Sequence, residues 1–337
     1  MNKILYVVPN IEKVSGGPRT RISMFKAIFL GHGEHVIEGK GKLRKAFASK
    51  KKARVYVESA TNRISFVDFL SLLYLKCISK EITVFIRDIY IELFPEEYSS
   101  LRGRITMLFN KTSNLFLTLI SDKMGFPTKE MGNVFFKKNT WFPKREYFAL
   151  PPGCIEMEGS NTKVDFSKPL GILYLGGISY PNSGFQHYLD FAEKYKGEFN
   201  FFVLSGDLGA DEMTKGMSHI KLEKVKHEEI PKYIAQNNIF MAFHSRPKNE
   251  YDDITFPIKV LDFIGIQLPF VTARHKPIID LLGKDYDLFV DISNIEEVYK
   301  AITNAKKIGN YTKLTNHLKD VALKNSYEDR YRTVFEK

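Results

Sequence analysis

Short apolar runs alternate with helical patterns along the whole chain. In the second half, the runs that fit buried strands are Gly171–Leu175, Phe199–Leu204, Ile220–Lys224, Ile239–Ala242, Pro269–Thr272 and Leu288–Val290. The segments between them that fit amphipathic helices are Phe185–Tyr195, Glu228–Gln236, Ile258–Ile264 and Ile295–Ala305. Buried strands that alternate with amphipathic helices predict a parallel sheet covered on both faces.

The first half carries the same alternation with fewer clear strands. Lys3–Val8, Arg54–Glu58 and Ile82–Ile86 fit buried strands, whereas Leu115–Ile120 fits a strand or a helix equally well. Two such halves predict an α/β protein with two Rossmann-like, parallel-sheet domains.

The length of 337 residues also favours two domains, because one hydrophobic core rarely organises so long a chain. A boundary is expected where Pro, Gly, Ser and Asn cluster between Tyr147 and Lys168. We therefore expect domains at residues 1–150 and 151–320. Ligands of doubly wound sheets bind beyond the carboxyl ends of the strands, so both halves are expected to face a shared cleft.

Cysteine usage and hydropathy indicate a cytoplasmic protein. Cys77 and Cys154 give neither a disulfide framework nor a zinc spacing, and no His/Cys cluster predicts a metal site. The apolar run within Met1–Val8 is too short for a secretory leader. No stretch approaches eighteen unbroken apolar residues, so no transmembrane helix is expected.

Four segments carry the most specific pattern. They are Ser15–Arg19 after the first strand, Leu150–Gly153, Phe256–Ile264 followed by Leu268–Val271, and Asn325–Arg330. In this order they resemble glycosyltransferase family 4, a large retaining family with the GT-B fold. The third segment is similar to the family pattern Pro-x-Lys-x-x-Glu-Tyr-(Met/Leu)-Ala-x-Gly-x-Pro-Val-Val.

The resemblance implies a nucleotide-sugar-dependent hexosyltransferase without a cofactor or metal. Residues 1–150 would bind the acceptor, residues 151–320 would bind a UDP- or GDP-sugar, and the C-terminal helix, 321–337, would return to the first domain. The acceptor would be a lipid-linked saccharide or a glycan, in cell-surface polysaccharide or glycoconjugate synthesis.

The resemblance assigns much of the donor site to one helix. Asp262 matches a carboxylate that accepts hydrogen bonds from the ribose hydroxyls, and a carboxylate suits this role because it offers only acceptors. Lys259, on the same helical face, would meet the diphosphate or pair with Asp262. Amides near the helix N-terminus suit a phosphate or a sugar hydroxyl; they belong to Phe256, Ile258 and Lys259. Pro257 pre-sets the start of the helix.

Other candidates lie in loops that follow strands. Arg246 would hold the diphosphate in a guanidinium fork, or would lie in a surface loop. Asp252 and Asp253 are candidates for the carboxylate that binds the transferred sugar, although the family spacing falls on Ile254.

The remaining candidates are Gly16 and Gly17, Gly176 and Gly177, Lys226 and His227, and Arg87. Paired glycines let backbone amides approach a phosphate closely. In the family, the loop at Lys226 and His227 packs on the nucleobase through its main chain. Arg87 stands where many relatives carry a His that contacts the donor sugar; a structural role with Asp88 is the alternative.

The sequence departs from the family in three places. Asp262 replaces the usual Glu, Gln267 stands where the family has Gly, and the loop Leu175–Tyr180 lacks the usual Arg and Lys. These departures keep open an alternative, a non-catalytic GT-B subunit that binds a glycosyltransferase or a lipid partner. A dehydrogenase would need Gly-x-Gly-x-x-Gly after a strand, which neither glycine pair supplies.

The net charge of +11 changes the expected location. Gly39–Arg54 contains eight Lys or Arg and no acid, and Val134–Phe148 interleaves aromatic with basic residues. Such segments suit an anionic membrane surface; a solvated face with core aromatics is the alternative. The chain shows no nucleic-acid-binding module. We therefore expect peripheral attachment to the inner face of the membrane.

Overall fold

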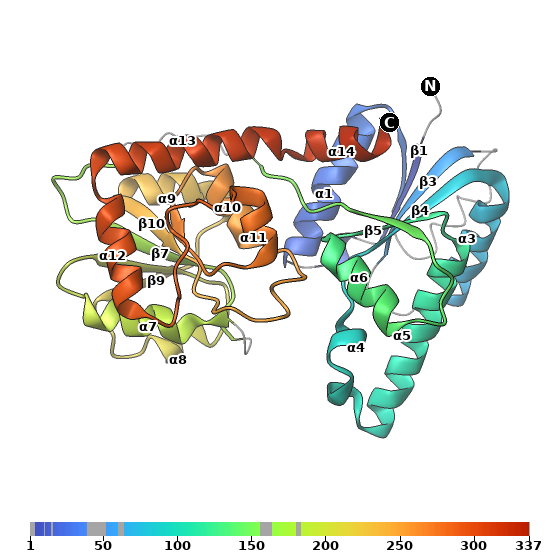
Figure 1. Cartoon of the computed structure of the whole chain (residues 1–337), viewed down its shortest axis with the longest axis horizontal. Coiled ribbons are helices and arrows are strands. Elements are labelled where there is room, and N and C mark those ends of the chain that lie inside the picture. The colour runs from blue at the N-terminus through green and yellow to red at the C-terminus, as the bar shows by residue number, and fades with distance from the viewer. Residues whose placement is uncertain are drawn as a thin grey trace. The chain divides into compact units, whose positions relative to one another are not determined.

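The computed structural model describes residues 4–9, 11–14, 16–38, 52–59, 64–155, 164–179 and 183–336. The chain divides into two compact units (Figure 1). The first unit joins Met1–Gly153 to Ile254–Phe256 and Tyr327–Lys337, and the second comprises Cys154–Asp253 and Pro257–Ser326.

The first unit is built on a six-stranded parallel sheet in the order β2-β1-β3-β4-β5-β6. Its strands are β1 Ile4–Val8, β2 His35–Glu38, β3 Lys52–Ser59, β4 Ser79–Ile86, β5 Lys123–Phe126 and β6 Glu146–Ala149. Its helices are α1 Gly16–Gly31, α3 Phe66–Ile78, α4 Tyr90–Leu93, α5 Leu101–Ile120, α6 Lys129–Lys138 and α14 Tyr327–Phe335, with 3-10 turns η1 Ile11–Lys13 and η2 Pro95–Tyr98.

Local signals fix where these helices begin. The hydroxyls of Ser65, Ser100 and Thr128 accept hydrogen bonds from amides in the first turns of α3, α5 and α6, which satisfies donors that the helix itself leaves unpaired. The run Leu115–Ile120, which fitted a strand or a helix, is the last part of α5.

The C-terminal helix α14 returns to the first unit and lies beside α1 (Figure 1). Its Phe335 ring lies 4.9 Å from the ring of Tyr56 on β3, and its Tyr331 ring lies 5.0 Å from that of Phe29 on α1. Burial of these aromatic side chains is the principal force that holds the helix in place.

The second unit contains a five-stranded parallel sheet in the order β11-β10-β7-β8-β9. Its strands are β7 Gly171–Leu175, β8 Asn200–Leu204, β9 Ile220–Glu223, β10 Ile239–Phe243 and β11 Phe270–Val271. Its helices are α7 Phe185–Lys194, α8 Ala210–Met213, α9 Ile230–Gln236, α10 Ile258–Gly265, α11 Lys276–Leu282, α12 Ile295–Ala305 and α13 Ile308–Lys324, with the 3-10 turn η4 His227–Glu229.

Both sheets are parallel with helices interleaved between strands, so the predicted double Rossmann-like architecture is confirmed. One predicted strand is wrong. Leu288–Val290 makes an isolated bridge, Phe289 to Thr272, and no ladder, because the neighbouring strand β11 ends at Val271 and Thr272 alone bonds to Leu288 and Val290.

Candidate functional site

The strand order of the second sheet has a switch point between β7 and β10. The chain leaves β7 toward β8 and β9 on one side, and β10 pairs with β7 on the other. Both strands end at the same edge, β7 at Leu175 and β10 at Phe243. Ligands of doubly wound sheets bind beyond the carboxyl ends of strands at such a point, so the side chains at this edge form the candidate site.

The loop after β7 begins with a glycine that packs under a lysine. Gly176 has φ +109°, and a Cβ on it would lie 2.6 Å from Cε of Lys259 on α10. The Lys259 Nζ lies 3.4 Å from the Tyr174 hydroxyl, 4.8 Å from the centre of the Tyr174 ring and 3.5 Å from the Gly177 carbonyl. The absence of a side chain at Gly176 therefore makes room for the lysine.

The ammonium of Lys259 stands where its charge is disfavoured. Burial, followed by the repulsion of Arg246, lowers the pKa of Lys259 to about 8, although Asp207, Asp252 and Asp262 act in the opposite direction. An anionic ligand beside it would stabilise the charged form and raise this pKa again. A perturbed lysine at a switch point is a feature of binding sites.

Asp207, in the loop after β8, holds the glycine loop in place. Its carboxylate accepts hydrogen bonds from the amides of Ile178 and Ser179, at 2.7 and 3.0 Å, and from the Ser179 hydroxyl at 2.8 Å. These bonds, led by that from the Ser179 amide, lower the pKa of Asp207. The Gly176 amide donates to the Leu204 carbonyl at 2.8 Å. The amides of Gly176, Ile178 and Ser179 therefore donate hydrogen bonds within the domain.

Asp262 lies one helical turn after Lys259 on α10 and meets a histidine. Its Oδ1 is 3.1 Å from Nε2 of His227 in η4, and this hydrogen bond raises the pKa of the imidazole. The Asp262 side chain is 19% exposed, so the carboxylate remains accessible at the surface of the domain. Lys226, predicted beside His227, is exposed directly before η4.

The residues predicted around the start of α10 belong to different units: Phe256 to the first, and Pro257 and Ile258 to the second. Pro257 is the N-cap of α10 and accepts the Val260 amide at 3.2 Å, and Ile258 is the first helical residue. Phe256 belongs to the first unit together with Ile254, whose carbonyl accepts the Thr128 hydroxyl.

Arg246 is paired with one of the predicted carboxylates. Its Nη1 lies 2.9 Å from Oδ1 of Asp252, whose side chain is 1% exposed. The Asn249 side-chain amide donates to the other Asp252 oxygen at 2.6 Å. Asp253 instead accepts the Lys276 amide at 2.9 Å, at the start of α11, and contacts the Lys248 ammonium. Both aspartates therefore have internal partners.

Sequence reasoning missed two buried histidines at the same edge. His244 follows β10 directly, and its Nδ1 lies 2.9 Å from the Thr272 hydroxyl. Burial lowers the pKa of His244 well below its ordinary value, with help from the positive charge of Lys259. His275 lies with its Nε2 3.2 Å from the Arg246 carbonyl, and burial lowers its pKa. Both histidines follow strands of the second sheet, and this position in the sequence could have identified them as candidates.

In the first unit, Gly16 and Gly17 form the first turn of α1, a turn without acidic residues. Arg87 follows β4. The neighbouring Asp88 accepts the amides of Ile89 and Tyr90, yet burial raises its pKa overall. These two hydrogen bonds tie Asp88 to the backbone at the start of α4, and the role of Arg87 stays a prediction.

A buried ion pair in the first unit also escaped sequence reasoning. Arg21 Nε lies 2.7 Å from Glu58 Oε1, and its Nη1 donates to the Leu150 carbonyl at 2.9 Å. The hydroxyls of Tyr56 and Tyr6 lie 3.0 and 3.4 Å from the other carboxylate oxygen. The network joins α1, β3 and the end of the first unit, and it requires both charges to be present together.

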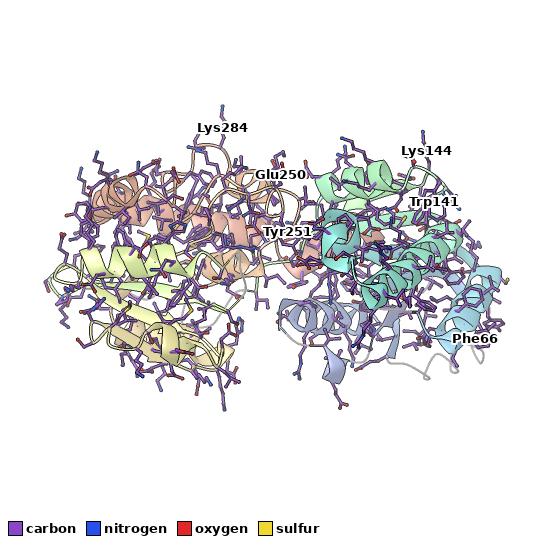
Figure 2. The ribbon with its side chains drawn as sticks, turned by 90° about the horizontal axis from the view of Figure 1, so that it is seen from below. Phe66, Trp141, Lys144, Glu250, Tyr251 and Lys284 are labelled. Carbon is purple, nitrogen blue, oxygen red and sulfur yellow. The ribbon has the colours of Figure 1, made fainter. Side chains whose placement is uncertain are left out.

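Of the two basic segments, the structure describes Val134–Phe148 but only the end of Gly39–Arg54. Most of Gly39–Arg54 lies outside the described residues; Arg54 itself pairs with Glu81 and donates to the Phe335 carbonyl. In Val134–Phe148, Phe135 and Phe142 are buried in the core, whereas Trp141 is 61% exposed and lies at the surface (Figure 2). The expected aromatic surface is wrong for these two phenylalanines, because they fill the space between α6 and the sheet.

Within the described residues, no group of three His, Cys, Asp or Glu side chains is placed to hold a metal ion. A search of the same residues finds no helix long and apolar enough to cross a membrane.

Comparison with known proteins shows the fold. No family model matches the chain, and no curated protein matches it. Among solved structures, a UDP-forming alpha,alpha-trehalose-phosphate synthase from Burkholderia xenovorans is similar, with a TM-score of 0.65 at 10% identity over 100% of this chain and 98% of that one. The same type of enzyme from that organism in complex with glucose-6-phosphate gives 0.61 at 9% identity, over 99% of both chains.

An alpha-glucosyltransferase in complex with UDP and a 13-mer DNA gives a TM-score of 0.66 at 10% identity, over 97% of this chain and 96% of that one. The chain therefore has the two-domain GT-B fold. Identities this low establish the fold alone.

Proposed function

We propose that the chain is a retaining glycosyltransferase that takes a sugar from a nucleotide-diphosphate donor, UDP- or GDP-linked. The observation that carries this proposal is the pair Lys259 and Asp262, one turn apart on α10 at the switch point of a GT-B domain. The solved structures of similar fold include glycosyltransferases, one of them bound to UDP.

In the proposed reaction, the bond between the anomeric carbon and the diphosphate oxygen breaks, the acceptor hydroxyl oxygen bonds to that carbon, and the hydroxyl proton passes to the departing diphosphate. Negative charge develops on the departing diphosphate. The Lys259 ammonium would stabilise this charge, and because burial already disfavours the lysine charge, both partners gain from the contact. Asp262 would accept the ribose hydroxyls, and His227 would orient its carboxylate.

The proposal is tested with UDP and GDP as ligands and Asp262→Asn as the variant. Each nucleotide that binds the parent raises its melting temperature, and Asp262→Asn is expected to weaken that rise because one acceptor becomes a donor. Asp280→Asn is the matched control, since Asp280 pairs with Lys276 on the exposed side of α11. If neither nucleotide binds the parent, or if Asp262→Asn binds as the parent does, the proposed donor site is wrong.

We further propose that the acceptor is a lipid-linked saccharide or glycan at an anionic membrane surface, in cell-surface polysaccharide or glycoconjugate synthesis. The eight basic residues of Gly39–Arg54 support a membrane partner. A screen of nucleotide sugars with lipid-linked and free glycans as acceptors tests this assignment.

One observation favours a second candidate, a non-catalytic GT-B subunit that binds a glycosyltransferase or lipid partner. The loop after β7 has neither Arg nor Lys, and Asp207 accepts two of its amides. Nucleotide binding without transfer or donor hydrolysis, across the whole screen, would support that candidate.

A further inference from the structure

Two helices of the first unit turn apolar stripes toward solvent. On α3 the exposed apolar residues are Phe66, Phe69, Leu70 and Leu73, at positions i, i+3, i+4 and i+7. On the first three turns of α5 they are Leu101, Ile105, Leu108 and Phe109, at i, i+4, i+7 and i+8; a further one, Leu119, lies at the other end of the helix. Such spacing places side chains on one face of a helix, which normally packs against a core. Here the exposed fractions run from 37 to 78%.

The two stripes belong to neighbouring helices. The rings of Phe69 on α3 and Phe116 on α5 lie 4.3 Å apart, which joins the helices. The fully buried residues of α5 all lie at its end, Leu117, Thr118 and Ile120. The first turns of α5 extend beyond the sheet of their unit together with α4 (Figure 1), and Phe66 lies at the surface (Figure 2). We name the eight exposed apolar residues the α3–α5 face.

The charge on α5 indicates what covers this face. The helix carries Arg102, Arg104 and Lys111 and no acid over its 20 residues. In the chain, Glu96 and Glu97 precede this helix in the turn η2, and Asp122 follows it and pairs with Lys76 of α3. The one acid within α3 is Asp68, which is bonded to the Ser65 hydroxyl at the start of that helix. Two copies of the chain that paired through this face about a twofold axis would bring like charges together. Anionic lipid headgroups complement the same charges, and Leu, Ile and Phe beside Arg are typical of an interfacial helix.

We infer that the α3–α5 face docks on an anionic lipid surface, with its apolar side chains inserted at the headgroup boundary and the α5 cations on the headgroups. This inference rests on the membrane partner proposed above and is independent of glycosyl transfer. It assigns the contact to apolar residues outside Gly39–Arg54. The chain net charge of +11 acts in the same direction.

The test is co-sedimentation of the full chain, without nucleotide, with vesicles of phosphatidylcholine containing phosphatidylglycerol. The face variant is Phe66→Ser, Leu101→Ser and Leu108→Ser. All three side chains are exposed, so the fold is expected to tolerate the changes, and a melting curve checks this. Because full burial of one such side chain is worth roughly a tenfold change or more in partitioning, the face variant is expected to bind at least about tenfold more weakly than the parent.

The matched control is Leu208→Ser with Ile308→Ser, two exposed apolar residues of the second unit. The control is expected to bind as the parent does, and Arg102→Gln with Arg104→Gln to reduce the preference for phosphatidylglycerol. Absence of binding by the parent overturns the inference, as does equal binding by parent and face variant. A parent that is dimeric in sedimentation velocity, with a monomeric face variant, assigns the face to a second copy instead. Nucleotide binding, measured separately, distinguishes these results from failure of the proposed donor site.

Discussion

Replacing Lys259 with methionine is expected to stabilise the protein while impairing its proposed activity. Burial lowers the pKa of Lys259 from 10.5 to about 8. The difference, 10.5 − 8, or about 2.5, corresponds to about 3.5 kcal/mol at about 1.4 kcal/mol for each pKa unit. The folded state disfavours the charged lysine by a free energy of this order. Loss of the cation–π contact with Tyr174 offsets roughly 0.5–2 kcal/mol of this, so Lys259→Met should stabilise the fold by about 1.5–3 kcal/mol at pH 7.

The sign of the pH dependence follows from the direction of the shift. Because the folded pKa lies below the unfolded one, the unfolded chain binds more protons between pH 8 and 10.5, and the stability of the parent rises over that range. The advantage of Lys259→Met should therefore be full below pH 8 and disappear by about pH 10.5. Urea unfolding of parent and variant from pH 6 to 11 measures it. Transfer should fall about a hundredfold or more, the usual cost of losing one contact to developing charge.

Lys221→Met is the matched control. Its ammonium lies 5.6 Å from the ring of Tyr233, but its side chain is 53% exposed and its pKa is raised, first by the hydrogen bond to Glu223. This variant should show no stability gain at pH 7. A stability difference between Lys259→Met and parent that stays constant with pH would refute the electrostatic reasoning, and unchanged transfer would refute the proposed role.

Three further outcomes are expected. Gly176→Ala should cost about 1–3 kcal/mol from its positive φ, plus the clash with Lys259, and the clash component should vanish in a Lys259→Ala background; urea unfolding separates the two. Arg21→Met should cost about 3–5 kcal/mol by leaving Glu58 buried and uncompensated, and Glu58→Gln in the same chain should restore much of it in a double-mutant cycle. Changing all three lysines of 50–52 to Glu should reduce sedimentation with anionic vesicles but leave nucleotide binding intact.

The sequence predicted the second domain better than the first for a physical reason. The predicted strand Gly171–Leu175 and helix Ile295–Ala305 match β7 and α12 in both bounds. These are apolar runs with sharp boundaries. In the first domain β5, Lys123–Phe126, and β6, Glu146–Ala149, were missed, since each has four residues, begins with a charge and lies toward one side of its sheet. Short strands of this kind lack the continuous apolar pattern that identifies a buried one.

The candidate site shows the same division between local and long-range information. The positions of Lys259 and Asp262 on one face of a helix follow from local spacing. The hydrogen bonds from the loop amides to Asp207 do not follow from local spacing. They join residues 28 and 29 positions apart, which the strand order of the sheet brings together. Likewise Arg246 was predicted as a phosphate ligand, and only the fold reveals that its guanidinium meets the buried Asp252.

These contacts indicate that Arg246 and Lys259, the two cations at the switch point, would contribute unequally to binding a diphosphate. The charge of Arg246 is already balanced by a carboxylate 2.9 Å away, so a diphosphate that approached it would compete with Asp252 and gain less. The charge of Lys259 is disfavoured where it stands, so a diphosphate beside it removes an existing cost. With no Arg or Lys in Leu175–Ser179 and two of its amides held by Asp207, the electrostatic demand of a diphosphate falls mainly on Lys259. The choice between the proposed transferase and the alternative, a non-catalytic GT-B subunit that binds a glycosyltransferase or lipid partner, therefore depends chiefly on this lysine.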